Sequence, residues 1–243
     1  VVVEVSQEDV TGPDQVDELV GSADKAGRKS VLLLIDGQGR QIMWAWLTDN
    51  PPDEKENGWS GVYGLPRSLW LGEDGTLRMR PVEELAMLRS HEKVWENISL
   101  ADGETRLLEE VTGDSCELRV EIEVGDAQRC GLKVRAAGDG EEETLLYYDR
   151  QTEELVFDAT KSGEKGRTEV ERAPFVLQPD EKLELRIFVD KSVVEIYAND
   201  RQAIGRRVYP SRGDSLGVAL ITAGGEARFE KVTAWRMAPS NSF

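Results

Sequence analysis

Cysteine, histidine and basic residues are scarce in this chain of 243 residues, and each scarcity excludes a class of protein. The only cysteines are Cys116 and Cys130, too few for a domain stapled by disulfides. His91 is the only histidine and has no cysteine beside it, so we expect no metal site. Lys and Arg number 30 against 47 acidic residues, and the resulting net charge of -17 disfavours nucleic acid and anionic membranes as partners.

The sequence also lacks long apolar runs and nucleotide-binding motifs. No run approaches the roughly 20 residues of a membrane span, and the opening VVVEVSQEDV lacks the basic region of a signal peptide. GxGxxG, a P-loop and GxSxG are all missing, so neither a nucleotide cofactor nor serine hydrolase chemistry is supported. Because the first residue is Val rather than Met, we expect the chain to begin partway through a longer gene product.

Short runs of alternating apolar and polar residues fill most of the chain. Examples are QIMWAWL, ELRVEIEV, LELRIFV and ARFEKVTAW, separated by turn formers such as GEDG, GDAQ and SRGD. A period of two with frequent turns predicts antiparallel β-sheet in a sandwich, barrel or propeller. The exception is PVEELAMLR, in which Pro81 at a first helical position and the spacing of Leu85 and Leu88 predict a short helix. We place a domain boundary after it, near residue 90.

The two cysteines are predicted to be free and buried. They lie in the strand-like segments ELRVEIEV and CGLKVRA or directly beside them, joined by the turn-like GDAQ. If these segments form a hairpin closing at Val124 and Arg129, Cys130 faces Glu123 and Cys116 lies seven residues further along. At about 3.3 Å per residue that separation is far beyond bridging distance.

Four segments, in one order along the chain, resemble glycoside hydrolase family 32, the invertases, inulinases and levanases. They are GRQIMWAWL, GWSGVYGLPRSLWL followed by GTLRMRPVEELAMLR, LRIFVDKSVVEIYANDRQAIGRRVYP, and DSLGVALITAGGEARFEKVTAWRM. The resemblance implies an all-β chain with the strands of the last blade of a five-bladed β-propeller, a short helical linker and a two-sheet antiparallel β-sandwich. The implied bounds are 1–80 for the partial propeller, 81–93 for the linker and 94–243 for the sandwich.

The segment GWSGVYGLPR is glycine-rich because, in this reading, the backbone turns tightly into a blade strand. Arg67 would tie that strand to the linker. Trp59 is a candidate for contact with a sugar, since aromatic faces stack on sugar rings. The alternative is that Trp59 and Tyr63 are core aromatics.

The catalytic residues of the family are missing from this chain. Retaining glycosidases need two carboxylates about 5 to 5.5 Å apart, and family 32 takes them, with a third carboxylate, from Asn-Asp-Pro-Asn, Glu-Cys and Arg-Asp-Pro segments. None of these segments is present, and the only Asn-Asp pair, Asn199-Asp200, is followed by Arg201. We therefore expect no catalytic residue, no cofactor and no activity from the chain alone.

Glu195 is the most conspicuous carboxylate of the predicted sandwich. A hairpin that turns at Asp190-Lys191 would place Arg186 opposite Glu195 as a structural partner, with alternate apolar residues on the other face. The alternative is sugar binding, as in carbohydrate-binding module family 66, which is similar to this sandwich. Glu195 with Arg206 or Arg207 would then hold the sugar.

The resemblance implies the C-terminal part of an enzyme that hydrolyses sucrose or a fructan with retention, without a cofactor. An incomplete propeller leaves strand edges and apolar faces exposed. We therefore expect either a companion polypeptide that carries the earlier blades or self-association. Two alternatives stay open: a fructan-binding module without catalysis, and a structural or oligomerisation domain.

Overall fold

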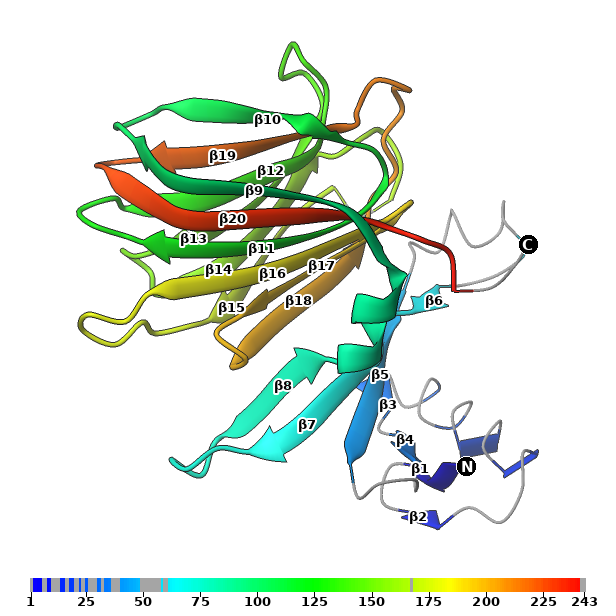
Figure 1. The fold of residues 1–243 in the computed structure, drawn as a ribbon. Coiled ribbons are helices and arrows are strands. Elements are labelled where there is room, and N and C mark those ends of the chain that lie inside the picture. Colours follow the sequence, from blue (N-terminus) through cyan, green and yellow to red (C-terminus); the bar gives the residue numbers. More distant parts are fainter. Residues whose placement is uncertain are drawn as a thin grey trace. The chain divides into compact units, whose positions relative to one another are not determined.

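The computed structural model divides the chain into two compact units, residues 1–85 and 86–243. It describes residues 40–48, 58, 61–166 and 168–240, the short segments 2–5, 8–9, 30–31 and 33–35, and a few positions between 14 and 25. Both units are built mainly from antiparallel strands (Figure 1), which confirms the all-β class. The described part contains no helix with the length and hydrophobicity of a membrane span.

The first unit contains two small antiparallel sheets. One has the strand order β2-β1-β4, and the other has the order β3-β5-β7-β8 with β6 paired to β5. The main path of the second sheet follows the order of its strands along the chain, as in the four-stranded sheets of propeller blades. The strands are β1 Val2–Val5, β2 Glu8–Asp9, β3 Ser30–Val31, β4 Leu33–Ile35, β5 Gln41–Leu47, β6 Val62–Tyr63, β7 Arg67–Leu71 and β8 Leu77–Pro81.

The glycine-rich segment before β7 makes the tight turn that the sequence predicted. Gly58 and Gly61 have positive φ angles of 72° and 65°. A Cβ on Gly61 would lie 2.6 Å from the carbonyl oxygen of Leu47, so a side chain at this position would force the two segments apart. Gly61 therefore lets the chain pass close to β5.

The connection between the units is shorter and tighter than the predicted helix. It is a 3₁₀ helix, η1, from Glu83 to Leu88, and strand β9 begins at the next residue. The expectation that Pro81 opens the helix is wrong, because Pro81 ends β8 and pairs with Arg67. Proline has no N–H to donate to a neighbouring strand, and β8 tolerates it because β8 is the edge strand of its sheet.

The second unit is a two-sheet antiparallel β-sandwich, as predicted. One sheet has the order β10-β19-β12-β13-β14-β15 and is named here the β13 sheet; the other, the β17 sheet, has the order β18-β17-β16-β11-β20-β9. The strands are β9 Arg89–Leu100, β10 Thr105–Thr112, β11 Ser115–Glu123, β12 Arg129–Ala136, β13 Glu143–Asp149, β14 Glu154–Lys161, β15 Val170–Pro174, β16 Leu183–Asp190, β17 Val193–Ala198, β18 Gln202–Arg207, β19 Gly217–Ala223 and β20 Ala227–Met237.

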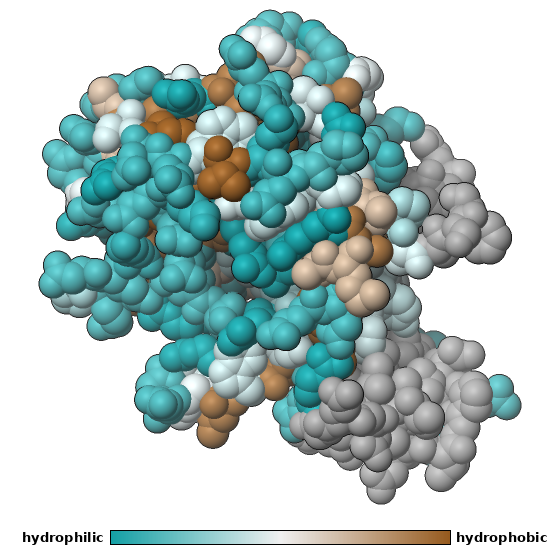
Figure 2. All heavy atoms as spheres, viewed as in Figure 1, coloured by the Kyte–Doolittle hydropathy of each residue, from teal (hydrophilic) through white to brown (hydrophobic). Residues whose placement is uncertain are grey.

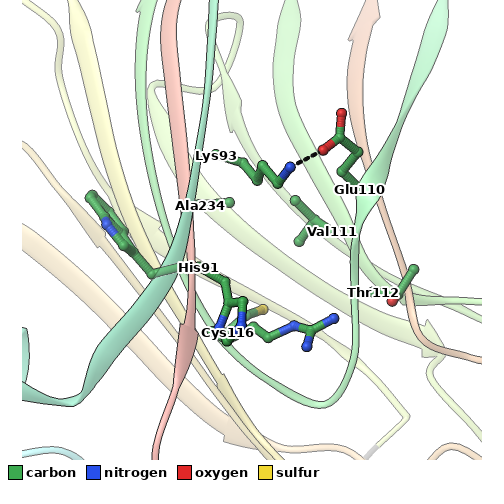
Figure 3. A pocket seen from close by; sticks show the side chains of 9 residues that line it. His91, Lys93, Glu110, Val111, Thr112, Cys116 and Ala234 are labelled. Carbon is green, nitrogen blue, oxygen red and sulfur yellow. Dashed lines mark ion pairs between the residues drawn. The ribbon is translucent and has the colours of Figure 1, made fainter.

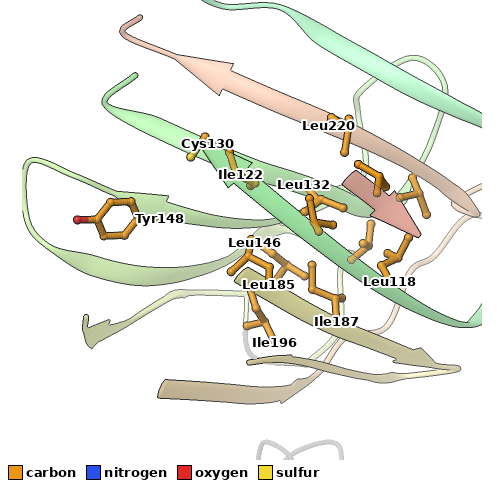
Figure 4. Packing of buried hydrophobic residues seen from close by; sticks show 14 of the residues in the cluster. Leu118, Ile122, Cys130, Leu132, Leu146, Tyr148, Leu185, Ile187, Ile196 and Leu220 are labelled. Carbon is orange, nitrogen blue, oxygen red and sulfur yellow. The ribbon is translucent and has the colours of Figure 1, made fainter. Parts of the chain in front are cut away.

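The core lies between these two sheets. Leu118 and Ile187 of the β17 sheet face Leu132 and Leu146 of the β13 sheet, and all four are fully buried (Figure 4). The apolar face predicted for the hairpin of β16 and β17 is part of this core, which confirms that expectation. The visible outer surface is mostly hydrophilic (Figure 2), in keeping with the high content of charged residues.

The hairpin predicted for the two cysteine strands is wrong. β11 pairs with β16 and β20, whereas β12 pairs with β13 and β19, so the chain crosses from one sheet to the other between them. Apolar and polar residues alternate in the same way in both strands, and a short turn sequence does not distinguish a hairpin from a crossing between two sheets. Cys116 and Cys130 are nevertheless free and buried, as predicted.

Candidate functional site

The outward face of the β17 sheet gathers charged and aromatic side chains. Along β16 and β17 alternate residues enter the core, so the residues between them share the opposite face. Those residues are Arg186, Phe188, Glu195 and Tyr197, and the last three are buried. This face therefore contains Glu195, one of the predicted binding residues.

Glu117 of β11 is the centre of an ion-pair network on this face. Its side chain is 0% exposed. Arg89 donates two hydrogen bonds to it, from Nε to Oε2 at 2.8 Å and from Nη2 to Oε1 at 2.6 Å. Arg186 donates from Nε to Oε1 at 2.7 Å, and Arg119 lies 3.5 Å away. Three cations around one buried carboxylate fix the sheet at this point.

The charge state of Glu117 follows from these partners. Burial by itself raises the pKa of Glu117, but the hydrogen bonds and charges of Arg89 and Arg186 outweigh it and hold the pKa below its usual range. The pKa of Arg186 is lowered, chiefly by burial and against the pull of Glu117. Glu117 is thus an ionised anchor, and it lacks the raised pKa of a general acid.

An indole ring extends the network at its edge. The guanidinium of Arg89 lies 4.2 Å from the ring centroid of Trp235, which is within range of a cation–π interaction. Trp235 also donates its Nε1 hydrogen to Glu92 at 3.0 Å. The guanidinium of Arg89 is therefore held by Glu117 through hydrogen bonds and by Trp235 through the cation–π interaction.

Glu195 does not lie opposite Arg186 in the strand register, so the register predicted for this hairpin is wrong. Glu195 lies opposite Phe188, and Arg186 lies opposite Tyr197, because the loop consists of Lys191 and Ser192. Glu195 is 0% exposed and accepts a hydrogen bond of 2.6 Å from the hydroxyl of Tyr197. Arg186 turns instead to Glu117.

The structure separates Glu195 from Arg206. Val194 pairs with Arg206 and Glu195 pairs with Gly205, so Arg206 lies on the opposite face of the sheet from Glu195. Arg206 forms ion pairs with Glu171 and, at 3.0 Å, with Glu169.

Arg207 does share the face of Glu195. It donates to the hydroxyl of Ser192 at 3.0 Å, and its guanidinium lies 4.9 Å from the ring of Tyr209. The third predicted binding residue, Trp59, lies outside the described residues.

A small hollow opens between the edge strands β9 and β10 (Figure 3). Its volume is about 90 Å³, and an ion pair between Lys93 and Glu110 crosses it. Cys116 lies in its lining, but burial raises the pKa of this thiol to about 12, so the thiol is no nucleophile near neutral pH. His91 lines the same hollow and contacts the hydroxyl of Ser90 at 3.1 Å. Among the described residues no group of three or more His, Cys, Asp and Glu could hold a metal ion.

Sequence reasoning missed the Glu117 network. Its members Arg89 and Arg186 are 28 and 69 residues away from Glu117, so no local motif connects them. Within its strand Glu117 has the same place in the alternation as the solvated Arg119 and Glu121. Only the order of strands in the sheet brings the three residues together.

Comparison with known proteins places the chain in a family. The family model described as "Glycosyl hydrolases family 32 C terminal" matches residues 84–236. The chain belongs to glycoside hydrolase family 32. This match confirms the family predicted from the sequence, and it covers almost all of the sandwich.

Relatives in family 32 are considerably longer than this chain. A sucrose-6-phosphate hydrolase of Zymomonas mobilis is 33% identical over 210 residues, which cover 84% of this chain and 40% of the relative. A levanase of Bacillus subtilis is 33% identical over 203 residues, or 78% of this chain and 28% of the relative. The chain thus spans less than half the length of these relatives.

The fold agrees with that of a family 32 structure. Fructan 1-exohydrolase IIa from Cichorium intybus matches with a TM-score of 0.78 and 20% identity, over 87% of this chain and 48% of the other. A match of this extent reaches beyond the second unit into the first.

Proposed function

We propose that this chain is the C-terminal part of a retaining β-fructofuranosidase-type hydrolase that acts on sucrose or a fructan, and that it contributes no catalytic carboxylate. The observation that carries the proposal is the family match over the sandwich in a chain that spans only 40% of a sucrose-6-phosphate hydrolase. Residues 1–80 belong to the last propeller blade in this account, and residues 94–243 form the sandwich.

The charge states of the described carboxylates support this assignment. A retaining glycosidase needs an acid with a raised pKa beside a nucleophile about 5 to 5.5 Å away. In the described part of the chain, each carboxylate with a resolved shift has its pKa lowered by hydrogen bonds or nearby cations, which is the opposite direction. These are Asp74, Glu84, Asp114, Glu117, Asp139, Glu142, Glu181 and Asp214.

The chain's role is then to complete the propeller and to support the pocket that earlier blades form. Those blades come from a companion polypeptide or an undivided parent protein. Self-association is the alternative way of covering the edges of an incomplete propeller.

The test is an assay of fructose release from sucrose and from levan. The chain alone is expected to release none, and a mixture with the polypeptide that carries the earlier blades of its parent is expected to be active. Fructose release by the purified chain alone would contradict the proposal.

A further inference from the structure

The outward face of the β13 sheet contains a hollow that the function proposed above does not use. Its volume is about 200 Å³. The neighbouring strands β14, β13, β12 and β19 contribute its lining (Figure 1). The polar lining residues include Arg129, Tyr147 and Asp158, and the apolar ones are Leu145, Ile221 and Ala223.

Close pairing of β12 with β13 beside this hollow depends on Gly131. In register, Gly131 of β12 lies between Tyr147 of β13 and Ile221 of β19. Cross-strand partners point to the same face, so a side chain at residue 131 would stand between those two. A Cβ at this position would lie 2.6 Å from the Cα of Tyr147, and the close strands therefore require glycine.

Tyr147 directs an unused polar group to this hollow. Only 6% of the residue is exposed, and its hydroxyl makes no hydrogen bond with the residues that the structure describes. The hydroxyl is not among the fully buried polar atoms that lack a partner, so a ligand in the hollow can reach it. Burial raises the pKa of Tyr147, partly opposed by Arg129 and Arg172, so the hydroxyl stays protonated and can both donate and accept.

Two more polar groups at the hollow are oriented by the protein and keep free capacity. Asp158 accepts the N–H and the hydroxyl of Thr160 at 2.9 and 2.6 Å through Oδ1, which leaves Oδ2 as an acceptor. Arg129 is fixed by its Nε hydrogen bond of 2.8 Å to Asp149. Its side chain is 53% exposed, and its terminal nitrogens are free to donate within the described part of the chain.

The lining selects a class of ligand by its charge and polarity. The positive charge of Arg129 is compensated by Asp149, and Arg172 nearby pairs with Glu154 at 3.1 Å. Asp158 would therefore repel an anion, and no uncompensated cation at the hollow would offset that repulsion. A metal ion would need a ligand cluster that the described residues do not contain. A neutral ring with hydroxyl groups on an apolar C–H face matches both the polar groups and the apolar floor.

We infer that this hollow, lined by Tyr147, Asp158 and Arg129, is a binding site for one neutral sugar ring. Asp158 accepts from a sugar hydroxyl, Arg129 donates to one, and the Tyr147 hydroxyl completes the set. The C–H face of the ring lies against Leu145 and Ile221. The site lies on the sheet opposite to Glu195 and does not depend on the catalytic assignment proposed above.

The experiment is a titration of the full chain with fructose, sucrose and 1-kestose, followed by ¹H–¹⁵N correlation spectra. Binding at this site is expected to shift the amide signals of β13 and β19. Tyr147→Phe keeps the ring and removes one hydrogen bond, so it should weaken binding by about two- to tenfold. Asp158→Asn removes a charged acceptor and should weaken binding by roughly tenfold or more. Glu121→Gln, a change of an exposed carboxylate on the other sheet, should leave sugar affinity unchanged.

Two results would overturn the inference. One is the absence of shifts in β13 and β19 with all three sugars at concentrations up to solubility. The other is equal affinity in the parent chain and in both site variants, or a loss of affinity in Glu121→Gln alone. Because fructose release is a separate assay, failure here leaves the proposed function untouched.

Discussion

Glu117 has more influence on the sandwich than any motif in the sequence suggests. It is fully buried, and it is ion-paired to Arg89 and Arg186, whose side chains are only 17% and 13% exposed. Taking one partner from a buried ion pair leaves the others uncompensated in a region of low dielectric.

We predict that Glu117→Gln lowers the free energy of unfolding by about 3 kcal/mol or more. The matched control is Glu121→Gln, a change of the same kind at an exposed position of the same strand, which should stay within about 0.5 kcal/mol of the parent. Urea unfolding of the three proteins measures both values. Equal losses in the two variants would contradict a special role for the network.

The network also makes stability depend on pH in a defined direction. The pKa of Glu117 is lowered in the folded chain, while an unfolded glutamate titrates near about 4.3, so the unfolded state binds more protons in this range. The stabilisation is complete above about pH 4.3 and is lost as the pH falls through the folded-state pKa.

The stability difference between the parent and Glu117→Gln should therefore be constant above about pH 4.3 and shrink as the pH falls below that value toward the folded-state pKa. Urea unfolding at a series of pH values measures this difference. A difference that does not shrink below about pH 4.3 would show that folding does not lower the pKa of Glu117.

Predictions made for single residues were correct in some places and wrong in others. The prediction that both cysteines are free and buried is confirmed, although the hairpin from which their distance was inferred is wrong. Pairing of Arg186 with Glu195 failed because the loop lies one residue further along than predicted. The true loop is held by the N–H of Lys191, which donates to the carbonyl of Asp114 at 2.6 Å. A contact from a distant strand connection cannot be read from the hairpin's own residues.

At the scale of elements, alternation predicted the strands well but not their neighbours. The apolar face of β16 and β17 is in the core as expected, because burial fixes which residues face inward. The order of strands in the sheets depends on crossings such as the one between β11 and β12, which leave no periodic signal. Both the Glu117 network and the hollow beside Tyr147 arise from that order, so neither was predicted.

The close pairing of β12 and β13 gives a prediction at this scale. Gly131→Ala places a Cβ against the backbone of Leu146 and Tyr147, and such overpacking should cost about 1–3 kcal/mol. Gly138→Ala is the control, because its Cβ would meet no atom within 4 Å, and it should change stability by less than about 1 kcal/mol. Thermal unfolding of both variants decides the matter, and equal stability would refute a requirement for glycine in β12.

At the scale of the whole molecule, several dispersed sequence matches predicted the family and the fold class better than any single residue predicted a site. The family model covers residues 84–236, and the four resembling segments fall in or next to the elements that define each unit. Chemistry was harder to predict, because the family's catalytic segments are missing and the remaining charged residues serve the sheet. The binding roles suggested for Trp59, Glu195 and Arg206 stay predictions.

We propose that this chain works as one part of a fructosidase and supplies no catalytic carboxylate. The decisive experiment is native mass spectrometry of the purified natural material, with a denaturing control and a sucrose assay on the same fractions. Fructose release should follow the fractions in which the chain is in stoichiometric complex with a second polypeptide or is joined to the earlier blades. Fructose release from fractions that contain only this chain, as a monomer or a homo-oligomer, would refute the proposal.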